Sequence, residues 1–362
     1  MNDVRAIAFY LPQFYPIPEN DKWWEPGFTE WTNVACARPL FKGHYQPKIP
    51  RDLGFYDLRV AETREKQAAL AREAGIEGFC YWHYWFGGGK RLLSEVFNDV
   101  VTSGEPDFPF CLCWANHSWY AKTWKSTTSM QNQLLMEQTY PGIEDYKAHF
   151  MEMLPAFKDK RYIKVNGKLL FGVFAGYDIP NCKVFFDTWN RLAEENGLNG
   201  FEFFALALGE KQLKKIEGLG FDRIVYDAYL DAAGNKSLIK NKVSTIIRHI
   251  LRKPYVISYP KYVESALLRF KKYSWCTPCI DPNFDHTPRS GVYGSLLHNS
   301  SPVKWGNLCK HVKKHILENN DIDNLLFIKA WNEWGEGNYL EPDRKWGKEY
   351  IKETFKALYQ ST

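Results

Sequence analysis

Two glutamates near the end of the sequence, Glu333 and Glu336, stand where an apolar run stops, in the segment IKAWNEWGEGNYLEP at residues 328–342. Residues three apart in a regular strand point to opposite faces. Gly335 and Gly337 permit tight turns after the strand, so both carboxyl groups can face one pocket walled by tryptophan. Such a pair is suited to cleaving a glycosidic bond: one carboxyl protonates the leaving oxygen, and the other acts on the opposite face of the sugar.

The alternative is that both glutamates are solvated loop residues paired with nearby Lys or Arg. Their position after a predicted strand and the flanking Trp331 and Trp334 favour the catalytic interpretation. An apolar neighbour of this kind raises the pKa of one carboxyl by desolvation, which keeps it protonated near neutral pH.

Eight short apolar runs predict the strands that position this pair. Most are continuously apolar rather than alternating, which is typical of parallel strands buried on both faces. The runs cover residues 6–11, 76–85, 108–116, 168–174, 201–208, 223–230, 277–285 and 324–334.

Amphipathic segments between the runs predict helices. The first covers residues 57–74, with Asp57 as its cap and Gly75 as its stop. Only the connection after the fifth run is too short to predict a full helix. The alternation predicts an α/β protein, a single (β/α)8 barrel with long βα loops in one domain over residues 1–362. The other helical segments are 91–103, 143–158, 182–196, 237–252, 259–272, 302–319 and 346–360.

In such a barrel the chemistry lies at the C-terminal ends of the strands, where polar and aromatic residues gather in this sequence. His83 is either a core histidine or a sugar ligand. Asp285 and Arg289 either pair with each other or bind hydroxyls or a phosphate. Glu30, in the long first loop, is expected to orient other side chains. The remaining candidates for sugar binding are Trp31, Trp82, Tyr84, Trp114, Asn116, His117, Trp119, Trp331, Asn332 and Trp334.

Composition excludes several other classes of function. The net charge of +5 is mild and its basic residues are scattered, so a nucleic-acid partner is not expected. No run approaches the roughly 18–20 apolar residues that span a bilayer, and the N-terminus lacks the features of a signal peptide. We therefore expect a cytoplasmic protein with reduced cysteines. We find no zinc motif and no P-loop, and we expect no metal and no cofactor.

Five motifs together resemble the WbsX-type family, which is labelled glycosyltransferase, occurs with bacterial surface-polysaccharide genes and is related to the endo-α-mannosidases of glycoside hydrolase family 99. The resemblance runs from about residue 5 to 355. The motifs are FYLPQFYPIPENDKWWEPGFTEWTNV, GFCYWHYWF, WANHSW, FDHTPR and WNEWGEGNYLEP.

The resemblance implies a (β/α)8 barrel that cleaves glycosides without a metal and with retention of configuration. By its closing motif, Trp-Asn-Glu-Trp-His-Glu-Gly in the hydrolases, Glu333 would be the base on the substrate's own 2-hydroxyl, giving a 1,2-anhydro sugar. Glu336 would be the general acid and then the base that activates water. Gly335 replaces the histidine of that motif, which puts the substrate in question. Tyr10 matches a first-strand tyrosine, which implies contact with sugar.

We therefore predict a metal-independent retaining glycoside hydrolase acting on α-linked, mannose-like glycans of bacterial surface polysaccharide. The alternative is a glycosyltransferase of O-antigen, lipopolysaccharide or capsule biosynthesis, which the family label and the expected location favour. The sequence has no second, Rossmann-like domain to support it. A non-catalytic glycan-binding barrel is disfavoured by the intact glutamate pair. The partner is an oligosaccharide or polysaccharide, and peripheral association with the inner membrane through a lipid-linked substrate stays open.

Overall fold

The computed structural model describes residues 4–121, 133–233, 252–319 and 322–360. Eight parallel strands form a closed barrel, because β3 pairs with β7 on one side and β1 pairs with β13 on the other. Each predicted run coincides with one of these strands, β1 beginning one residue early, and the predicted fold class is confirmed. The strands are β1 (Arg5–Tyr10), β2 (Gly78–His83), β3 (Phe110–Trp114), β7 (Lys168–Val173), β8 (Phe201–Leu208), β9 (Arg223–Asp227), β11 (Thr277–Ile280) and β13 (Leu325–Ile328).

Aromatic rings fill the interior of the barrel. Phe9 stacks on Trp82 with ring centroids 4.7 Å apart and also packs against Phe327 at 5.5 Å. Phe204 contacts Phe327 from another side at 4.9 Å. Gly172 makes room for this packing, since a Cβ there would lie 2.2 Å from the Phe204 ring. Because such contacts bury the inner face of each strand and helices cover the outer face, the residues of a strand are apolar on both faces and form a nearly unbroken apolar run in the sequence.

Helices cover the outside of the barrel, close to the predicted segments. The first, α3, begins at Ala61 rather than at the predicted cap: Asp57 instead binds the Arg59 side chain at 2.7 Å, and Val60 occupies the cap position. A short helix, α7, fills the connection after the fifth run. The segment predicted at 237–252 lies outside the described residues except for residue 252. The helices are α3 (Ala61–Glu73), α4 (Glu95–Ser103), α5 (Ile143–Phe157), α6 (Cys182–Glu195), α7 (Glu210–Ile216), α10 (Tyr259–Lys272), α12 (Pro302–Leu317) and α13 (Glu349–Tyr359).

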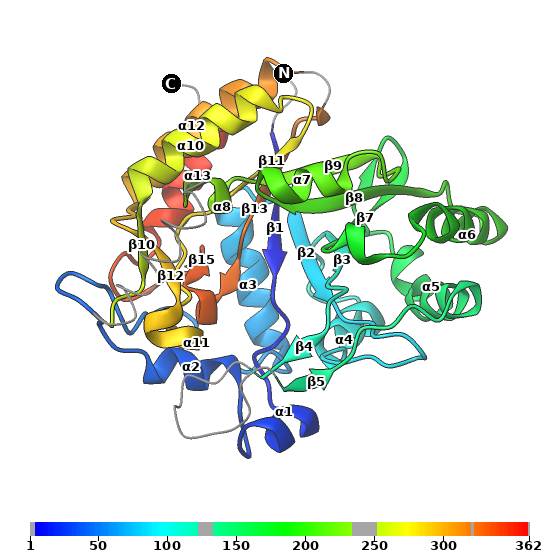
Figure 1. Ribbon diagram of the computed structural model, residues 1–362, viewed down its shortest axis with the longest axis horizontal. Helices are drawn as coiled ribbons and strands as arrows, with labels where there is room; N and C mark the ends of the chain where they lie inside the picture. Colours follow the sequence, from blue (N-terminus) through cyan, green and yellow to red (C-terminus); the bar gives the residue numbers. More distant parts are fainter. Residues whose placement is uncertain (1–3, 122–132, 234–251, 320–321, 361–362) are drawn as a thin grey trace, which may run out of the picture.

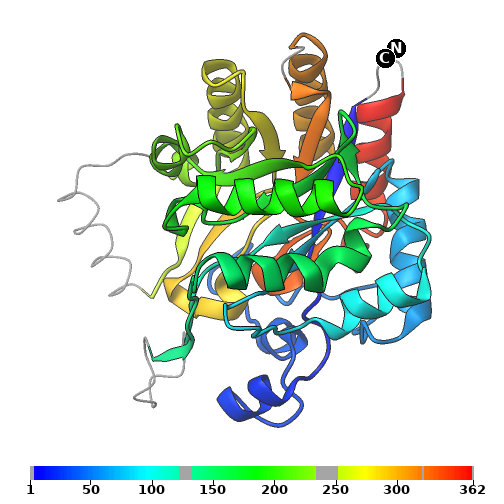
Figure 2. The ribbon, with the colours of Figure 1, turned by 90° about the vertical axis from the view of Figure 1, so that its right-hand side faces the viewer.

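Smaller elements are built mostly into the connections that follow the strands. Figure 1 shows α1, α2, α11, β4 and β5 at the end toward which β1 points, and Figure 2 shows the termini together at the opposite end. The small helices are α1 (Pro18–Trp23), α2 (Glu30–Cys36), α8 (Tyr229–Ala232), α11 (Thr287–Ser290), η1 (Gly176–Asp178), η2 (Gly291–Tyr293) and η4 (Trp334–Glu336). The small strands are β4 (Trp119–Tyr120), β5 (Leu134–Met136), β6 (Lys164–Val165), β10 (Tyr255–Ser258), β12 (Ser295–His298), β14 (Asn332–Glu333) and β15 (Asn338–Tyr339).

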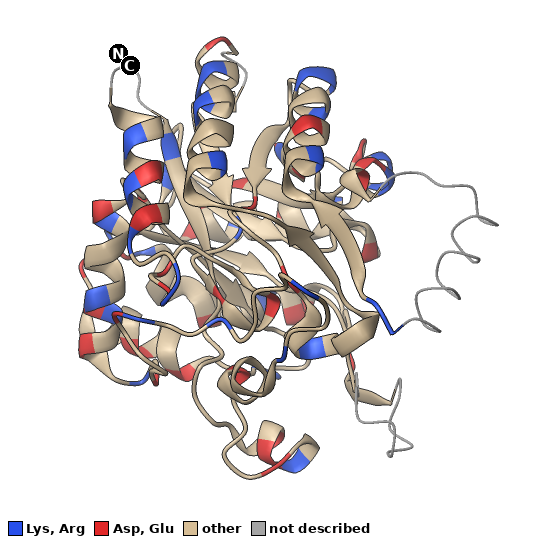
Figure 3. Ribbon diagram, turned by 90° about the vertical axis from the view of Figure 1, so that its left-hand side faces the viewer, with Lys and Arg blue, Asp and Glu red and all other residues tan. Residues whose placement is uncertain are grey.

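The outer helices carry both basic and acidic side chains (Figure 3). On α10, Arg269 and Lys272 both pair with Glu210, at 2.8 and 2.9 Å. None of the helices in the described ranges has the length and apolar character that a membrane span requires. All eight cysteines are unpaired thiols, and seven of them are buried.

Candidate active site

A cavity of about 740 Å³ lies at the C-terminal end of the barrel. Residues at or after the C-terminal ends of all eight barrel strands line it, together with the first βα loop. Its volume falls within the range of small-molecule sites, and its walls are largely aromatic. The aromatic side chains that line it are Trp23, Trp24, Phe28, Trp82, Tyr84, Trp119, Tyr120, Phe174, Tyr229 and Phe284.

Glu333 projects into this cavity from β14, directly after β13. Its side chain is almost fully buried, and Oε1 accepts a hydrogen bond of 2.7 Å from Trp82 Nε1. Burial, followed by the nearby charge of Glu336, raises the pKa of Glu333 to about 7, although Lys329 and Arg289 oppose the shift. Glu333 therefore keeps its proton to much higher pH than an ordinary glutamate.

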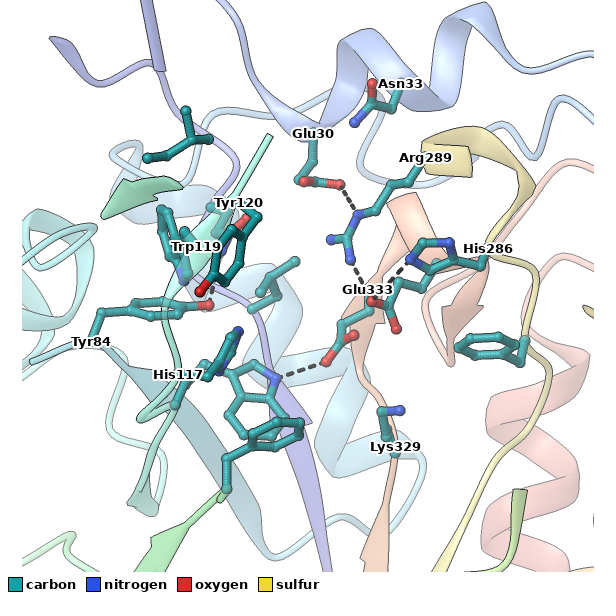
Figure 4. Close-up of a pocket in the computed structure, with 18 of the residues that line it drawn as sticks. Glu30, Asn33, Tyr84, His117, Trp119, Tyr120, His286, Arg289, Lys329 and Glu333 are labelled. Atoms are coloured by element: carbon teal, nitrogen blue, oxygen red, sulfur yellow. Dashed lines mark hydrogen bonds and ion pairs between the residues drawn. The ribbon is translucent and has the colours of Figure 1, made fainter. Parts of the chain in front are cut away.

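Glu336, one turn later in η4, has the opposite electrostatic setting. Burial raises its pKa, but Arg289, Lys329 and His286 outweigh burial and lower the pKa to about 2. The Arg289 guanidinium donates directly to Glu336 Oε1, and His286 Nε2 lies 3.9 Å from the same oxygen (Figure 4). Glu336 is therefore ionised across the physiological pH range.

The two carboxyl groups are hydrogen-bonded to each other, which lowers the pKa of Glu336 further. Below about pH 7 the pair holds one proton and one negative charge, and coupled groups of this kind titrate as a unit. In the unliganded cavity the proton resides on Glu333. The roles expected from the resemblance need the reverse distribution, with the proton on Glu336.

Arg289 links Glu336 to the first βα loop. Its Nε donates to Glu30 Oε2 at 3.0 Å, so the guanidinium lies between two carboxylates. A Cβ at Gly335 would stand 1.9 Å from that same Glu30 oxygen. The Glu30 carboxylate thus fills the space next to Gly335, which explains why this position has no side chain.

Asp285 belongs to a separate network behind the loop that carries Glu333 and Glu336. It accepts hydrogen bonds of 2.7 Å from His44 and Gln46, and its own backbone N–H donates to Glu336 O at 2.6 Å. The anticipated alternative of an Asp285–Arg289 ion pair is wrong, because each residue has other partners. Asp285 holds the backbone of Glu336 in place rather than lining the cavity.

Two charged residues that were not predicted lie in the same cavity. Lys329 follows β13, and Asp227 ends β9; the Nζ atom of the lysine is 3.9 Å from Oδ2 of the aspartate. Both stand inside apolar runs of the sequence, and fully buried Lys and Asp are rare unless they are paired. A charge within a run predicted to be buried was therefore the signal that could have revealed them.

Five of the predicted sugar-binding residues do line the cavity. Tyr84 accepts a 2.8 Å hydrogen bond from Gln13, and Trp119 meets the Tyr84 ring edge-on at 5.2 Å. In Figure 4, His117, Tyr84, Trp119 and Tyr120 lie across the cavity from Arg289 and His286. The five are Trp82, Tyr84, His117, Trp119 and Arg289.

The other predicted sugar-binding residues do not line the cavity but lie behind its wall, and their role as sugar ligands stays a prediction. Several of them hydrogen-bond within the protein. Tyr10 donates to Gln67 at 2.7 Å, and Asn332 accepts from Leu11 N at 2.7 Å. His83 bonds to His149 in the core. The residues behind the wall are Tyr10, Trp31, His83, Trp114, Asn116, Asp285, Trp331, Asn332 and Trp334.

The tryptophans beside the glutamates brace the loop instead of walling the pocket. Trp334 stacks on Tyr339 with centroids 3.8 Å apart and donates to Glu341 at 2.6 Å. Trp331 packs against Phe79 at 5.4 Å. The tryptophans next to the two glutamates in sequence thus point into the core, because the chain turns after β13. Among the described residues, no group of three or more His, Cys, Asp or Glu is placed to hold a metal ion.

Comparison with known proteins agrees with this architecture. Two curated proteins named "Uncharacterized protein WxcX", from two strains of Xanthomonas campestris pv. campestris, are each 33% identical over 362 residues, covering 97% of this chain and 49% of theirs. The chain therefore spans about half the length of these curated relatives. A solved "Glycoside hydrolase-like protein" superposes with a TM-score of 0.61 at 13% identity, covering 99% of this chain and 94% of that one.

The GH99 endo-alpha-mannosidase from Bacteroides thetaiotaomicron superposes with a TM-score of 0.59 at 15% identity, covering 98% of this chain and 96% of that chain. Structural likeness at this level of identity shows a shared fold. The model of the family described as "Glycosyltransferase WbsX" matches residues 6–354. The chain therefore belongs to the WbsX glycosyltransferase family and has a fold like that of the GH99 endo-alpha-mannosidase.

Proposed function

We propose that this protein is a metal-independent retaining glycoside hydrolase in which Glu333 and Glu336 cleave an α-linked, mannose-like glycoside. The observation that carries the proposal is the buried carboxyl pair in an aromatic-walled cavity, with one carboxyl protonated and the other ionised. A carboxylic acid and a carboxylate at one sugar-sized site are the groups that glycoside cleavage needs.

In the proposed first step, Glu333 takes the proton of the substrate's 2-hydroxyl and the 2-oxygen attacks C1. The glycosidic bond breaks, and Glu336 gives its proton to the leaving oxygen. In the second step Glu336 takes a proton from water, whose oxygen attacks C1 of the 1,2-anhydro sugar. The C1–O2 bond breaks and Glu333 returns the proton to O2, so configuration is retained overall.

This sequence requires the shared proton to move from Glu333 to Glu336 when substrate binds. The hydrogen bond between the carboxyl groups provides a path for that transfer. A 2-hydroxyl that donates to Glu333 adds a second donor beside Trp82 Nε1, and hydrogen bonds to the charged form of a carboxyl lower its pKa. Substrate binding itself therefore favours the reactive distribution.

A glycosyltransferase is the second candidate, favoured by the description of the family to which the chain belongs. The charges of the described cavity residues oppose a diphosphate donor: Glu30, Glu333, Glu336 and Asp227 line it beside the cations Arg289 and Lys329. Each of these two cations already faces a carboxylate.

We propose bacterial surface polysaccharide as the source of the glycan, free or lipid-linked, and the cytoplasm, peripheral to the inner membrane, as the place of action. The support for this is the family description and the resemblance of the motifs.

Thermal melting with candidate ligands separates the two functions, because a ligand stabilises the folded state according to its concentration over its Kd. A mannose-configured iminosugar is expected to raise the Tm of the wild type and to lose this effect in Glu333→Gln. Stabilisation by a nucleoside diphosphate sugar, with none by the iminosugar, would refute the hydrolase proposal in favour of transfer.

A further inference from the structure

We propose that a second cavity, behind the loop that carries Glu333 and Glu336, binds an acidic sugar, a monosaccharide unit that bears a carboxylate or a phosphate. This rear cavity has a volume of about 280 Å³. The first βα loop, the segment after β11, β12, the start of α12 and the segment between β15 and α13 enclose it. Its charged and titratable residues include Lys48, Asp285, His298, Lys304, Asp343 and Lys345.

Three lysines line the rear cavity, and in the described ranges none of them forms an ion pair with a carboxylate. The ammonium groups of Lys48 and Lys304 each donate to a backbone carbonyl, at 2.8 and 2.7 Å. The ammonium group of Lys345 lies over the rings of Tyr45 and Trp346, 4.6 and 4.8 Å from their centres. Because an ammonium group carries three donors, Lys304 and Lys345 keep donors for a ligand.

The two aspartates that line the rear cavity do not neutralise these lysines, because other donors of the protein bind them. Asp285 accepts four hydrogen bonds within the protein, at 2.6–3.0 Å. Asp343 accepts from the Tyr339 hydroxyl at 2.9 Å and from Trp346 N at 2.6 Å. Three lysines and two aspartates leave one positive charge in excess, which an anionic ligand would balance.

The positive groups of the rear cavity also act on one another. Lys48 is only 8% exposed. Burial lowers its pKa and the charge of Lys345 lowers it further, although the two aspartates oppose the shift. Burial also lowers the pKa of His298, followed by neighbouring cations that include Lys304 and Lys345. A bound anion would favour the charged form of these groups and so offset the cost of burying positive charge.

The start of α12 and several neutral polar groups complete the rear cavity. Ser301 caps the helix and accepts from Lys304 N at 3.4 Å, so the positive end of the helix dipole adds to the lysines. Ser300, Tyr350 and Asn283 also line the cavity, and their hydroxyl and amide groups can bind sugar hydroxyls. The volume lies just below the range of sites for drug-sized ligands, which suits one monosaccharide unit with its anionic group.

The rear cavity is separate from the cavity of the glutamate pair, and the two have no lining residue in common among those the structure describes. Phe284 and His286 line the cavity of the pair, whereas Asn283 and Asp285 line the rear cavity, as alternate residues of an extended segment do. The inference therefore does not rest on the proposed function, and its test does not depend on cleavage of a glycan.

Isothermal titration calorimetry of the full chain tests the rear cavity. The probes are hexuronates and hexose 6-phosphates of gluco, galacto and manno configuration, inorganic phosphate, and neutral glucose. The variants are Lys304→Met and Lys345→Met, single and combined, because both side chains reach solvent. Lys48 is left intact, since it also holds the Gly337 carbonyl. The matched control is Lys310→Met, on the same helix but outside the cavity.

We expect at least one acidic sugar to bind the wild type, and the combined variant to bind it about tenfold more weakly or worse. Lys310→Met should bind it like the wild type, and glucose should bind about tenfold more weakly than the acidic sugar because it has no anion. Added salt should weaken the binding to the wild type, a result that needs no variant. Tighter binding of a hexuronate supports a carboxylate as the group recognised, and tighter binding of a hexose 6-phosphate supports a phosphate.

Three results would overturn the inference. One is failure of every acidic sugar to bind the wild type at millimolar concentration. Another is unchanged affinity in the combined variant, because the ligand would then bind elsewhere. The third is inorganic phosphate that binds as tightly as the best acidic sugar, because the cavity would then recognise the anion without the sugar.

Discussion

Replacing Glu333 by glutamine should make the protein more stable at neutral and alkaline pH, at the expense of function. Burial and the Glu336 charge raise the pKa of Glu333 from its ordinary value of 4.5 to about 7 in the folded protein. The folded state then binds more protons than the unfolded state. The free energy of unfolding therefore falls as the pH rises from about 4.5 through about 7.

The size of this effect follows from the two pKa values of Glu333. The difference between 4.5 and about 7 corresponds to about 3 kcal/mol, fully lost above the upper value. Glu333 is only 4% exposed, so solvent screening is small. Glutamine keeps the shape of the side chain and the carbonyl that accepts from Trp82, so the substitution removes the charge with little change in packing.

Urea denaturation of the wild type and Glu333→Gln between pH 5 and 8.5 measures this difference. The two stabilities should converge near the acidic end and separate by about 3 kcal/mol at pH 8. Burial also raises the pKa of Glu341 to about 7. Glu341 titrates in both proteins, so its contribution cancels in the difference between their free energies of unfolding. Glu349→Gln, on the outer helix α13, controls for the loss of any glutamate. Parallel curves for the wild type and Glu333→Gln would refute the reasoning.

Three further substitutions test the surroundings of the pair. Gly335→Ala should push Glu30 away from Arg289, because the new Cβ would lie 1.9 Å from Glu30 Oε2. The substitution should lower the free energy of unfolding, measured by denaturation, by about 1–3 kcal/mol. Unchanged stability with Glu30 in place would contradict this. Arg289→Met should raise the pKa of Glu336 from about 2, because burial then acts without its main opposing cation; a ¹³C NMR titration of labelled glutamates with an unchanged Glu336 would contradict this. Trp82→Phe removes the 2.7 Å donor to Glu333 and should raise the pKa of Glu333 in the same titration, and a lowered pKa would count against that donor's role.

The barrel could be predicted from the sequence because burial on both faces leaves a clear pattern. Seven of the eight strands lie wholly within the predicted runs, most of which are continuously apolar, and β1 (Arg5–Tyr10) begins one residue before its run. Helix starts were less predictable. Asp57 has the right chemistry for a cap, yet it binds Arg59 in a turn and the helix begins at Ala61. Local side-chain bonding of this kind competes with capping and is not visible in hydrophobic periodicity.

The site was only partly predictable. Proximity in sequence to a strand end identified Glu333, Glu336 and Arg289, but it could not tell which aromatic rings face the cavity. Trp334 faces the core because η4 turns the chain between the two glutamates. Lys329 was missed because it continues an apolar run, and its ion pair with Asp227 depends on β9 lying nearby. Such details depend on contacts between different strands, which cannot be inferred from the residue spacing within a single segment.

Cleavage of glycosyl fluorides by single glutamate variants tests the central assignment most directly. Fluoride leaves without protonation, so a general acid is dispensable for it. With α-mannosyl and α-mannobiosyl fluorides, Glu336→Gln is expected to release fluoride while failing on an unactivated glycan, and Glu333→Gln is expected to fail on both. Fluoride release at the wild-type rate by Glu333→Gln would contradict the proposal that the buried carboxyl pair performs the cleavage.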